Sequence, residues 1–291
     1  MEKQLRWCCG SFSWVIRRTL VMGVVNVTPD SFSDGGCWDT PEAGVEHGLR
    51  LWAAGADILD VGGESTRPGA LPVSVEQEID RVAPVVSALA REGACVSVDT
   101  SKAAVAAVAL ASGASIVNDV SSGGDPDMFP LLSAEFCGLV LMHMRGEPRT
   151  MQRDPVYDDV VGEVCDWLSE RVAAAGRAGI ARDRLILDPG IGFGKTLQHN
   201  LMLLAGLPVL SRLGLPLLVG TSRKSFFQRL FGLEVEKRLE ITLATQVWAS
   251  LSGASVVRVH DVTEAAEVAA ISDFLEGAAG TPFFAANKLL L

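Results

Sequence analysis

The sequence predicts an α/β protein built as a single (β/α)8 TIM barrel. Eight short runs rich in Val, Ile and Leu alternate with helix-like stretches along the 291-residue chain. Each run is apolar throughout, as in parallel strands that are buried on both faces. One barrel of this kind uses about 250 residues, so the length fits one domain with short extensions. An open, doubly wound sheet is the alternative fold.

Strands and helices follow one another in regular order. The predicted strands cover residues 20–27, 57–62, 94–99, 115–120, 138–143, 185–188, 216–220 and 255–260. The predicted helices cover residues 40–54, 75–92, 102–111, 126–134, 158–178, 200–212, 223–231, 235–252 and 263–275, and the first begins at a Thr-Pro pair suited to a helix start. Because no linker rich in Pro, Gly or Ser divides the chain, we expect one domain at 19–278, an N-terminal extension at 1–18 and a C-terminal tail at 279–291.

Charge and composition argue against several classes of protein. The chain has 25 Lys and Arg residues against 35 Asp and Glu residues, a formal net charge of −10. An acidic chain without a basic stripe argues against nucleic acid as a partner. The uncharged run after Arg18 is too short for a signal peptide or a membrane span, and the six cysteines form no CxxC pair. We therefore expect no membrane association, reduced thiols and a cytoplasmic location.

Each predicted strand ends at or beside a polar residue. These residues are Asn26, Asp60, Asp99, Asn118, His143, Asp188, Ser222 and, together, Arg258 and His260. The carboxyl ends of all strands in a TIM barrel open into one mouth, so we expect these side chains to meet. A planar ligand edge with two N–H groups would satisfy a buried carboxylate among them. The alternative is that each of these residues caps a helix or braces a neighbouring loop. Asp60 is the one for which we most expect the bracing role.

Two further features suggest a phosphate-binding loop and a zinc ligand, but neither matches the pattern that such a site requires. Residues 190–196 look like a phosphate-binding P-loop, but Pro189 stands where that motif needs Gly. We expect a flexible loop whose backbone amides approach a ligand closely. His143 lies between two methionines, and no His/Cys cluster has zinc spacing, so we expect a packed histidine and not a metal ligand.

Two basic segments are candidates for anion binding. Residues 222–225 follow the seventh strand and are predicted to open a helix, whose free amides and dipole suit a carboxylate or phosphate. Arg258 and His260 lie on one side of the eighth strand and could clamp a diphosphate. The alternatives are that Ser222 is a simple N-cap, and that Arg258 pairs with Asp261 at the surface.

Taken together, these segments resemble the dihydropteroate synthase family. The most specific match is Asp60-Val61-Gly62-Gly63-Glu64-Ser65-Thr66-Arg67-Pro68-Gly69. Further matches are residues 22–36, 97–102, 118–119, 141–144, 188–195, 222–225 and 258–262, in the family's order. The resemblance implies a transferase of folate biosynthesis, with residues 19–278 as a pterin-binding catalytic barrel. Such an enzyme joins 6-hydroxymethyl-7,8-dihydropterin diphosphate to p-aminobenzoate, giving 7,8-dihydropteroate and diphosphate.

The resemblance also implies a role for individual residues. Those expected to contact the pterin are Asp99, Asn118, Met142, Asp188, Phe193 and Lys224. Arg258 and His260 would hold the diphosphate, and Asn26 would bind Mg²⁺. Ser222 would face the carboxylate of p-aminobenzoate. Thr66 and Arg67 would act from a loop over the site, and together with Asp99 and Lys224 they form the implied catalytic set.

The resemblance carries expectations beyond the site as well. Family members are commonly homodimers, and the residues around Arg67 match the sulfonamide-sensitive form of the enzyme. Two alternatives remain, a pterin-binding methyltransferase module that serves a corrinoid partner and a catalytically inactive paralogue that only binds pterin. The basic segments at 222–225 and 258–260 argue against the first, because such a module binds no diphosphate.

Overall fold

Eight parallel strands form the centre of the molecule, in a computed structural model that describes residues 5–28, 40–65, 70–147 and 150–279. The strands are β3 (Leu20–Asn26), β4 (Ile58–Gly62), β5 (Val96–Asp99), β6 (Ile116–Asp119), β7 (Gly138–Met142), β8 (Leu185–Asp188), β9 (Leu218–Val219) and β10 (Val256–Val259). Neighbours pair in the order β8-β7-β6-β5-β4-β3-β10-β9. A parallel bridge between Leu187 and Leu217 joins the two ends of this order. The closed barrel confirms the predicted fold and excludes the open sheet.

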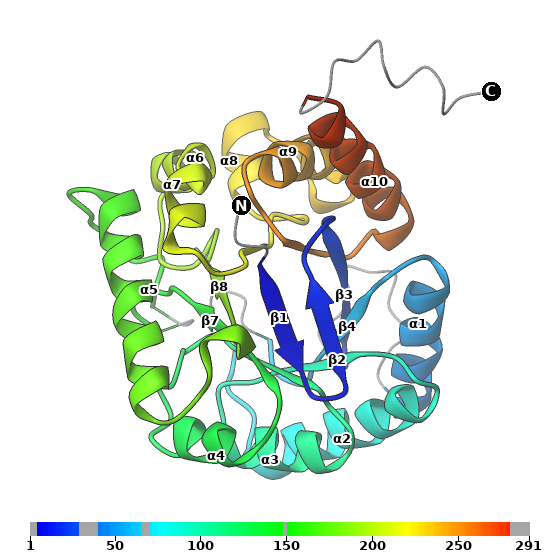
Figure 1. Ribbon diagram of the computed structural model, residues 1–291. Helices are drawn as coiled ribbons and strands as arrows, with labels where there is room; N and C mark the ends of the chain where they lie inside the picture. Colours follow the sequence, from blue (N-terminus) through cyan, green and yellow to red (C-terminus); the bar gives the residue numbers. More distant parts are fainter. Residues whose placement is uncertain (1–4, 29–39, 66–69, 148–149, 280–291) are drawn as a thin grey trace.

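A ring of helices surrounds the strands, as Figure 1 shows. The helices are α1 (Pro41–Ala53), α2 (Val75–Arg91), α3 (Ala103–Ala111), α4 (Met128–Ala134), α5 (Val160–Arg177), α6 (Leu197–Ala205), α7 (Leu207–Leu210), α8 (Phe226–Phe231), α9 (Leu239–Leu251) and α10 (Val262–Ala279). Helices α1 and α2 begin close to their predicted positions, because the residues before them are strong helix N-caps. Thr40 caps α1 by accepting from the N–H of Ala43 at 3.3 Å, and Ser74 forms a capping box with Gln77 at the start of α2.

Three predicted helices differ from the observed ones. The helix predicted at 235–252 begins with a 3₁₀ turn at Val235–Lys237, and α9 starts only at Leu239. The region 200–212 divides into the end of α6, α7 and a 3₁₀ turn at Ser211–Leu213. Gly206 ends α6, and Pro208 has no N–H with which to continue it. The helix predicted from residue 223 begins only at Phe226, because Arg223 has a φ of +55°, far outside the helical region.

A hairpin of residues from the predicted N-terminal extension closes one end of the barrel. Strands β1 (Arg6–Cys9) and β2 (Phe12–Val15) pair in antiparallel fashion and lie across the barrel in Figure 1. Trp7 is fully buried and packs with a cluster of apolar side chains from all around the barrel, and its Nε1–H donates to the carbonyl of Arg184 at 3.1 Å. The sequence did not predict a role for this segment. The structure makes it part of the core.

The described residues contain neither a bilayer-spanning helix nor a disulfide bond. In the described part of the chain, no helix has the length and apolar composition needed to cross a bilayer. The cysteines within the described ranges, Cys8, Cys9, Cys95, Cys137 and Cys165, are all free thiols.

Trp7→Ala should lower the free energy of unfolding by about 3–5 kcal/mol, because it empties a fully buried site and removes a hydrogen bond. Trp14→Ala, on the half-buried face of the same hairpin, is the matched control and should lower it less. Urea unfolding followed by circular dichroism measures both. Equal stability of the Trp7 variant and the parent chain would mean that the hairpin is not part of the cooperative core.

Candidate functional site

The polar residues at the strand ends meet around one cavity of about 400 Å³. It is lined by ten residues that the sequence singled out, namely Asn26, Asp99, Asn118, Met142, Asp188, Phe193, Ser222, Lys224, Arg258 and His260. They come from loops or strand ends spread over more than 230 positions, so only barrel closure brings them together. Thr66 and Arg67, the other two predicted site residues, lie outside the described residues.

The floor of the cavity is formed by Asp99, Asn118 and Asp188. All three are buried, and Asp99 Oδ1 has no hydrogen-bond partner among the described residues. Desolvation raises the pKa of Asp99 to about 7, against the opposing charge of Arg258. Desolvation also raises the pKa of Asp188, although its Oδ1 accepts the N–H of Gly190 at 2.7 Å. These carboxylates are strong acceptors that call for donors from a ligand.

Arg258 joins the floor to the strand beside it. Its Nε donates to Asp60 Oδ2 at 2.6 Å, and its Nη2 donates to Asp99 Oδ2 at 2.8 Å. Asn118 donates to the same oxygen of Asp60 at 3.0 Å. Asp60 is fully buried and is not among the residues that line the cavity, which confirms its bracing role. The alternative pairing of Arg258 with Asp261 is wrong, because Asp261 binds Arg223 at 2.6 Å.

Lys224 lies above the floor against an aromatic ring. Its Nζ is 4.2 Å from the ring centroid of Phe193, a cation–π contact. Desolvation lowers the pKa of Lys224 to about 8, while the charges of Asp188 and Asp99 act in the opposite direction. Lys224 is partly buried, so its ammonium is a partly desolvated donor from which a ligand acceptor gains a strong hydrogen bond.

Ser222 and His260 form a polar pair at the other side of the cavity. Ser222 Oγ lies 2.9 Å from His260 Nδ1 and accepts the backbone N–H of His260 at 3.2 Å. Residues 222–225 form a turn and not the predicted helix start. Arg238 holds this turn by donating to the carbonyl of Arg223 at 2.9 Å. The expectation of a helix dipole directly behind Ser222 is therefore wrong, and α8 begins four residues later.

The glycine-rich loop after β8 is held in place more firmly than expected. A Cβ at Gly190 would overlap the carbonyl oxygen of His143, so this position needs Gly at its φ of +66°. Lys195 is buried below the loop and donates to the carbonyl of Phe193 at 2.8 Å. Its Nζ also lies 3.0 Å from His143 Nδ1, and the imidazole packs edge-on to Trp167. His143 is thus a packed histidine, as predicted, and the loop is anchored at several points.

Asn26 is the residue expected to bind a metal. It is the last residue of β3 and lines the cavity. Within the described ranges, no group of three or more His, Cys, Asp or Glu side chains is arranged to hold a metal ion. A side-chain amide oxygen is nevertheless a hard ligand that suits Mg²⁺ when substrate phosphates and waters complete the shell. The residues present therefore fit a metal that arrives with a substrate.

Several lining residues were missed by the sequence reasoning as contributors to the site. They include Thr28, Glu64, Ser65, Met151 and Arg238. Glu64 and Ser65 belong to the most specific motif, so their position in it was an available signal. Arg238 gave no signal, because it stands in a charged stretch that reads as a solvated helix and yet it is buried.

Comparisons with known proteins agree with one another. Residues 22–260 match the family described as "Pterin binding enzyme". The chain is similar to the dihydropteroate synthase of Escherichia coli strain K12, with 49% identity over 248 residues that cover 85% of this chain and 88% of the relative.

Solved structures show the same similarity. A Yersinia pestis dihydropteroate synthase in a sulfonamide drug complex superimposes with a TM-score of 0.91 at 42% identity, covering 94% of this chain and 100% of the other. The Burkholderia cenocepacia enzyme complexed with 7,8-dihydropteroate gives 0.87 at 38% identity, covering 95% and 98%. With the barrel and its cavity of buried carboxylates, these matches establish that the chain belongs to the dihydropteroate synthase family of pterin-binding enzymes.

Proposed function

We propose that this chain condenses 6-hydroxymethyl-7,8-dihydropterin diphosphate with p-aminobenzoate, giving 7,8-dihydropteroate and diphosphate. The observation that carries the proposal is the cavity floor, where Asp99, Asn118 and Asp188 are buried together beneath Lys224. The same reaction is implied by the relatives' names, and one relative was solved with 7,8-dihydropteroate.

The floor suits the pterin ring in shape and in hydrogen bonding. Asp188 would accept the amino group and the ring N–H, which form a planar pair of donors. Asp99 Oδ1, which has no partner among the described residues, would accept a further ring N–H. Lys224 would donate to the O4 and N5 side of the ring, while Phe193 and Met142 pack near its faces. Each buried polar group then gains a partner on binding, which favours the pterin over an apolar ligand of similar size.

The diphosphate would lie at the mouth of the cavity, near Asn26, Arg258 and His260. Arg258 already binds two carboxylates, so little of its charge is left for a ligand. We therefore propose that Asn26 and the diphosphate oxygens hold a Mg²⁺ ion there. Such an ion supplies charge neutralisation for the departing diphosphate.

The reaction then needs no covalent bond to the protein. As the C–O bond to the diphosphate breaks, positive charge develops on the dihydropterin, and the Asp99 carboxylate on the cavity floor would stabilise it. The neutral arylamine of p-aminobenzoate attacks the exocyclic carbon and then loses a proton. Ser222 and the turn at residues 222–225 would hold the carboxylate of p-aminobenzoate so that its nitrogen faces this carbon.

We also propose that the chain works as a cytoplasmic homodimer. Five large apolar side chains on α9 and α10 are about half exposed, namely Trp248, Leu251, Ile271, Phe274 and Leu275. A patch of this kind commonly marks a protein–protein contact, and a second copy of the chain would cover it. The free thiols at the described cysteines fit a reducing compartment.

The test of this function is a turnover assay with the pterin diphosphate and Mg²⁺, with and without p-aminobenzoate. We expect dihydropteroate and diphosphate in equal amounts, only when p-aminobenzoate is present, and loss of turnover when EDTA removes the metal. Sulfamethoxazole should compete with p-aminobenzoate. Pterin binding without product would favour the inactive paralogue, and methyl transfer to a corrinoid protein would favour the methyltransferase module.

Lys224→Ala should lower kcat/KM for the pterin diphosphate by about 10- to 150-fold, the loss expected when a charge-assisted hydrogen bond of about 1.5–3 kcal/mol is removed. Pterin affinity should fall as well, because the bond forms in the ground state. Lys237→Ala, an exposed lysine outside the cavity, is the matched control and should behave as the parent. Near-equal kcat/KM for Lys224→Ala and the parent would contradict the role assigned to Lys224.

A further inference from the structure

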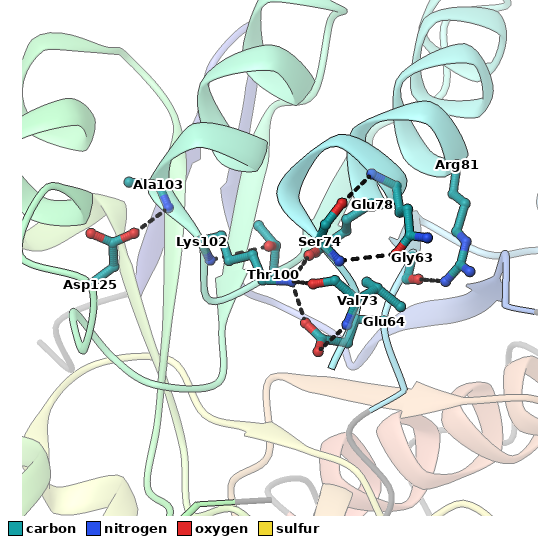
Figure 2. A network of polar contacts seen from close by, with 11 residues as sticks. Gly63, Glu64, Val73, Ser74, Glu78, Arg81, Thr100, Lys102, Ala103 and Asp125 are labelled. Atoms are coloured by element: carbon teal, nitrogen blue, oxygen red, sulfur yellow. Dashed lines mark hydrogen bonds and ion pairs between the residues drawn. The ribbon is translucent and has the colours of Figure 1, made fainter. Parts of the chain in front are cut away.

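One ammonium group beside the cavity joins three segments of the chain, as Figure 2 shows. Lys102 immediately precedes α3, and its Nζ donates to Glu64 Oε2 at 2.7 Å, to Glu78 Oε2 at 2.6 Å and to the carbonyl of Val73 at 2.9 Å. A lysine ammonium has three N–H donors, so this one is fully used. Lys102 itself is not among the residues that line the cavity.

Two partners of Lys102, Glu64 and Val73, stand at the two ends of the connection between β4 and α2, and the third, Glu78, lies in α2. Glu64 follows β4 and lines the cavity, whereas Val73 precedes the N-cap of α2. The N–H of Val73 also donates to Glu64 Oε1 at 3.2 Å, and Arg81 from α2 donates to the carbonyl of Gly63 at 2.8 Å. The point where the connection leaves the barrel is therefore tied to the point where it returns.

Lys102 contacts two carboxylates, and only one of these contacts is needed to neutralise a buried charge. Glu78 is fully buried, so it needs a cation, and Lys102 provides one. Desolvation acts most strongly on Lys102 and lowers its pKa, but the hydrogen bonds to Glu64 and Glu78 outweigh it, and the pKa is raised overall. The ammonium thus stays charged near neutral pH. Neutralising Glu78 does not require Glu64, which is partly exposed and is the member that reaches the cavity.

We propose that Lys102 is a positioning residue for the reaction, acting through Glu64. By holding Glu64 and Val73, it fixes the cavity wall at Glu64 and Ser65, next to the end of β3 where Asn26 lies. The inference rests on the proposed function. The pterin floor comes from β5, β6 and β8 and is held by Arg258 and Asp60, and among the partners of Lys102 only the charge of Glu78 acts on it, by raising the pKa of Asp99. Loss of Lys102 should therefore impair the use of the diphosphate group and turnover, and leave binding of the pterin ring itself largely intact.

The experiment compares Lys102→Met with Lys102→Arg, which keeps the charge. For Lys102→Met we expect kcat/KM for the pterin diphosphate to fall by about 10²-fold, the scale of a misplaced reacting group. The Kd of 6-hydroxymethyl-7,8-dihydropterin, which lacks the diphosphate, should stay within about 3-fold by calorimetry, well below one order of magnitude. Lys102→Arg should recover most of the activity. Arg18→Met breaks an ion pair with Asp57 away from the cavity and is the matched control, with turnover unchanged.

A second pair of variants covers the case in which Lys102→Met does not fold. Glu78→Gln combined with Lys102→Met removes the buried charge together with its partner, and the selective loss should persist. Glu78→Gln alone leaves Lys102 bound to Glu64 and should remain active. Unchanged kcat/KM in the Lys102 variants, or an equal loss of affinity for the diphosphate-free pterin and of kcat/KM for the pterin diphosphate, would overturn the proposal. A parent chain that forms no dihydropteroate would instead contradict the proposed function.

Discussion

The site depends on one buried carboxylate oxygen that is shared by two donors. Asp60 Oδ2 accepts from Arg258 and from Asn118, and Arg258 extends the contact to Asp99. Four strands of the barrel are joined in this way, β4, β6, β10 and β5. Without the guanidinium, Asp60 and Asp99 would be two buried anions whose repulsion favours protonation. The ion pair therefore limits this repulsion and fixes the positions of the two carboxylates.

This network explains how one floor can combine rigidity with reactivity. Arg258 opposes the desolvation of Asp99, yet the pKa of Asp99 still rises to about 7, so its carboxylate is basic and poorly solvated. Such a group interacts strongly with charge that develops beside it. Lys224 has the complementary property, with a pKa lowered to about 8 by burial. The contacts of Asp60 and Arg258 hold the cavity floor in place. In our proposal, Lys102 does the same for the cavity wall at Glu64, so floor and wall are held by separate groups of residues.

The sequence predicted the barrel and most of the cavity, because strand ends carry local signals. A continuous apolar run that stops at Asp99 or Asp188 can be recognised without knowledge of the fold, and barrel closure then brings the stops together. The contact between Asp60 and Arg258 spans 198 residues and has no local signal. Backbone details were missed for the same reason. The left-handed Arg223 is held by Asp261 and Arg238, which are distant in sequence, so the predicted helix start failed.

The most direct test of this account is the affinity of Asp60→Asn for the pterin diphosphate, measured by calorimetry. Asp60 is not among the residues that line the cavity, so any effect must pass through Arg258 and Asn118. We predict an affinity at least about 10-fold weaker, the size of one lost charge-assisted hydrogen bond, in a variant that keeps its circular dichroism spectrum. Asp57→Asn, which changes an ion pair away from the cavity, should bind as the parent does. Unchanged pterin affinity in folded Asp60→Asn would contradict the claim that this shared oxygen organises the site.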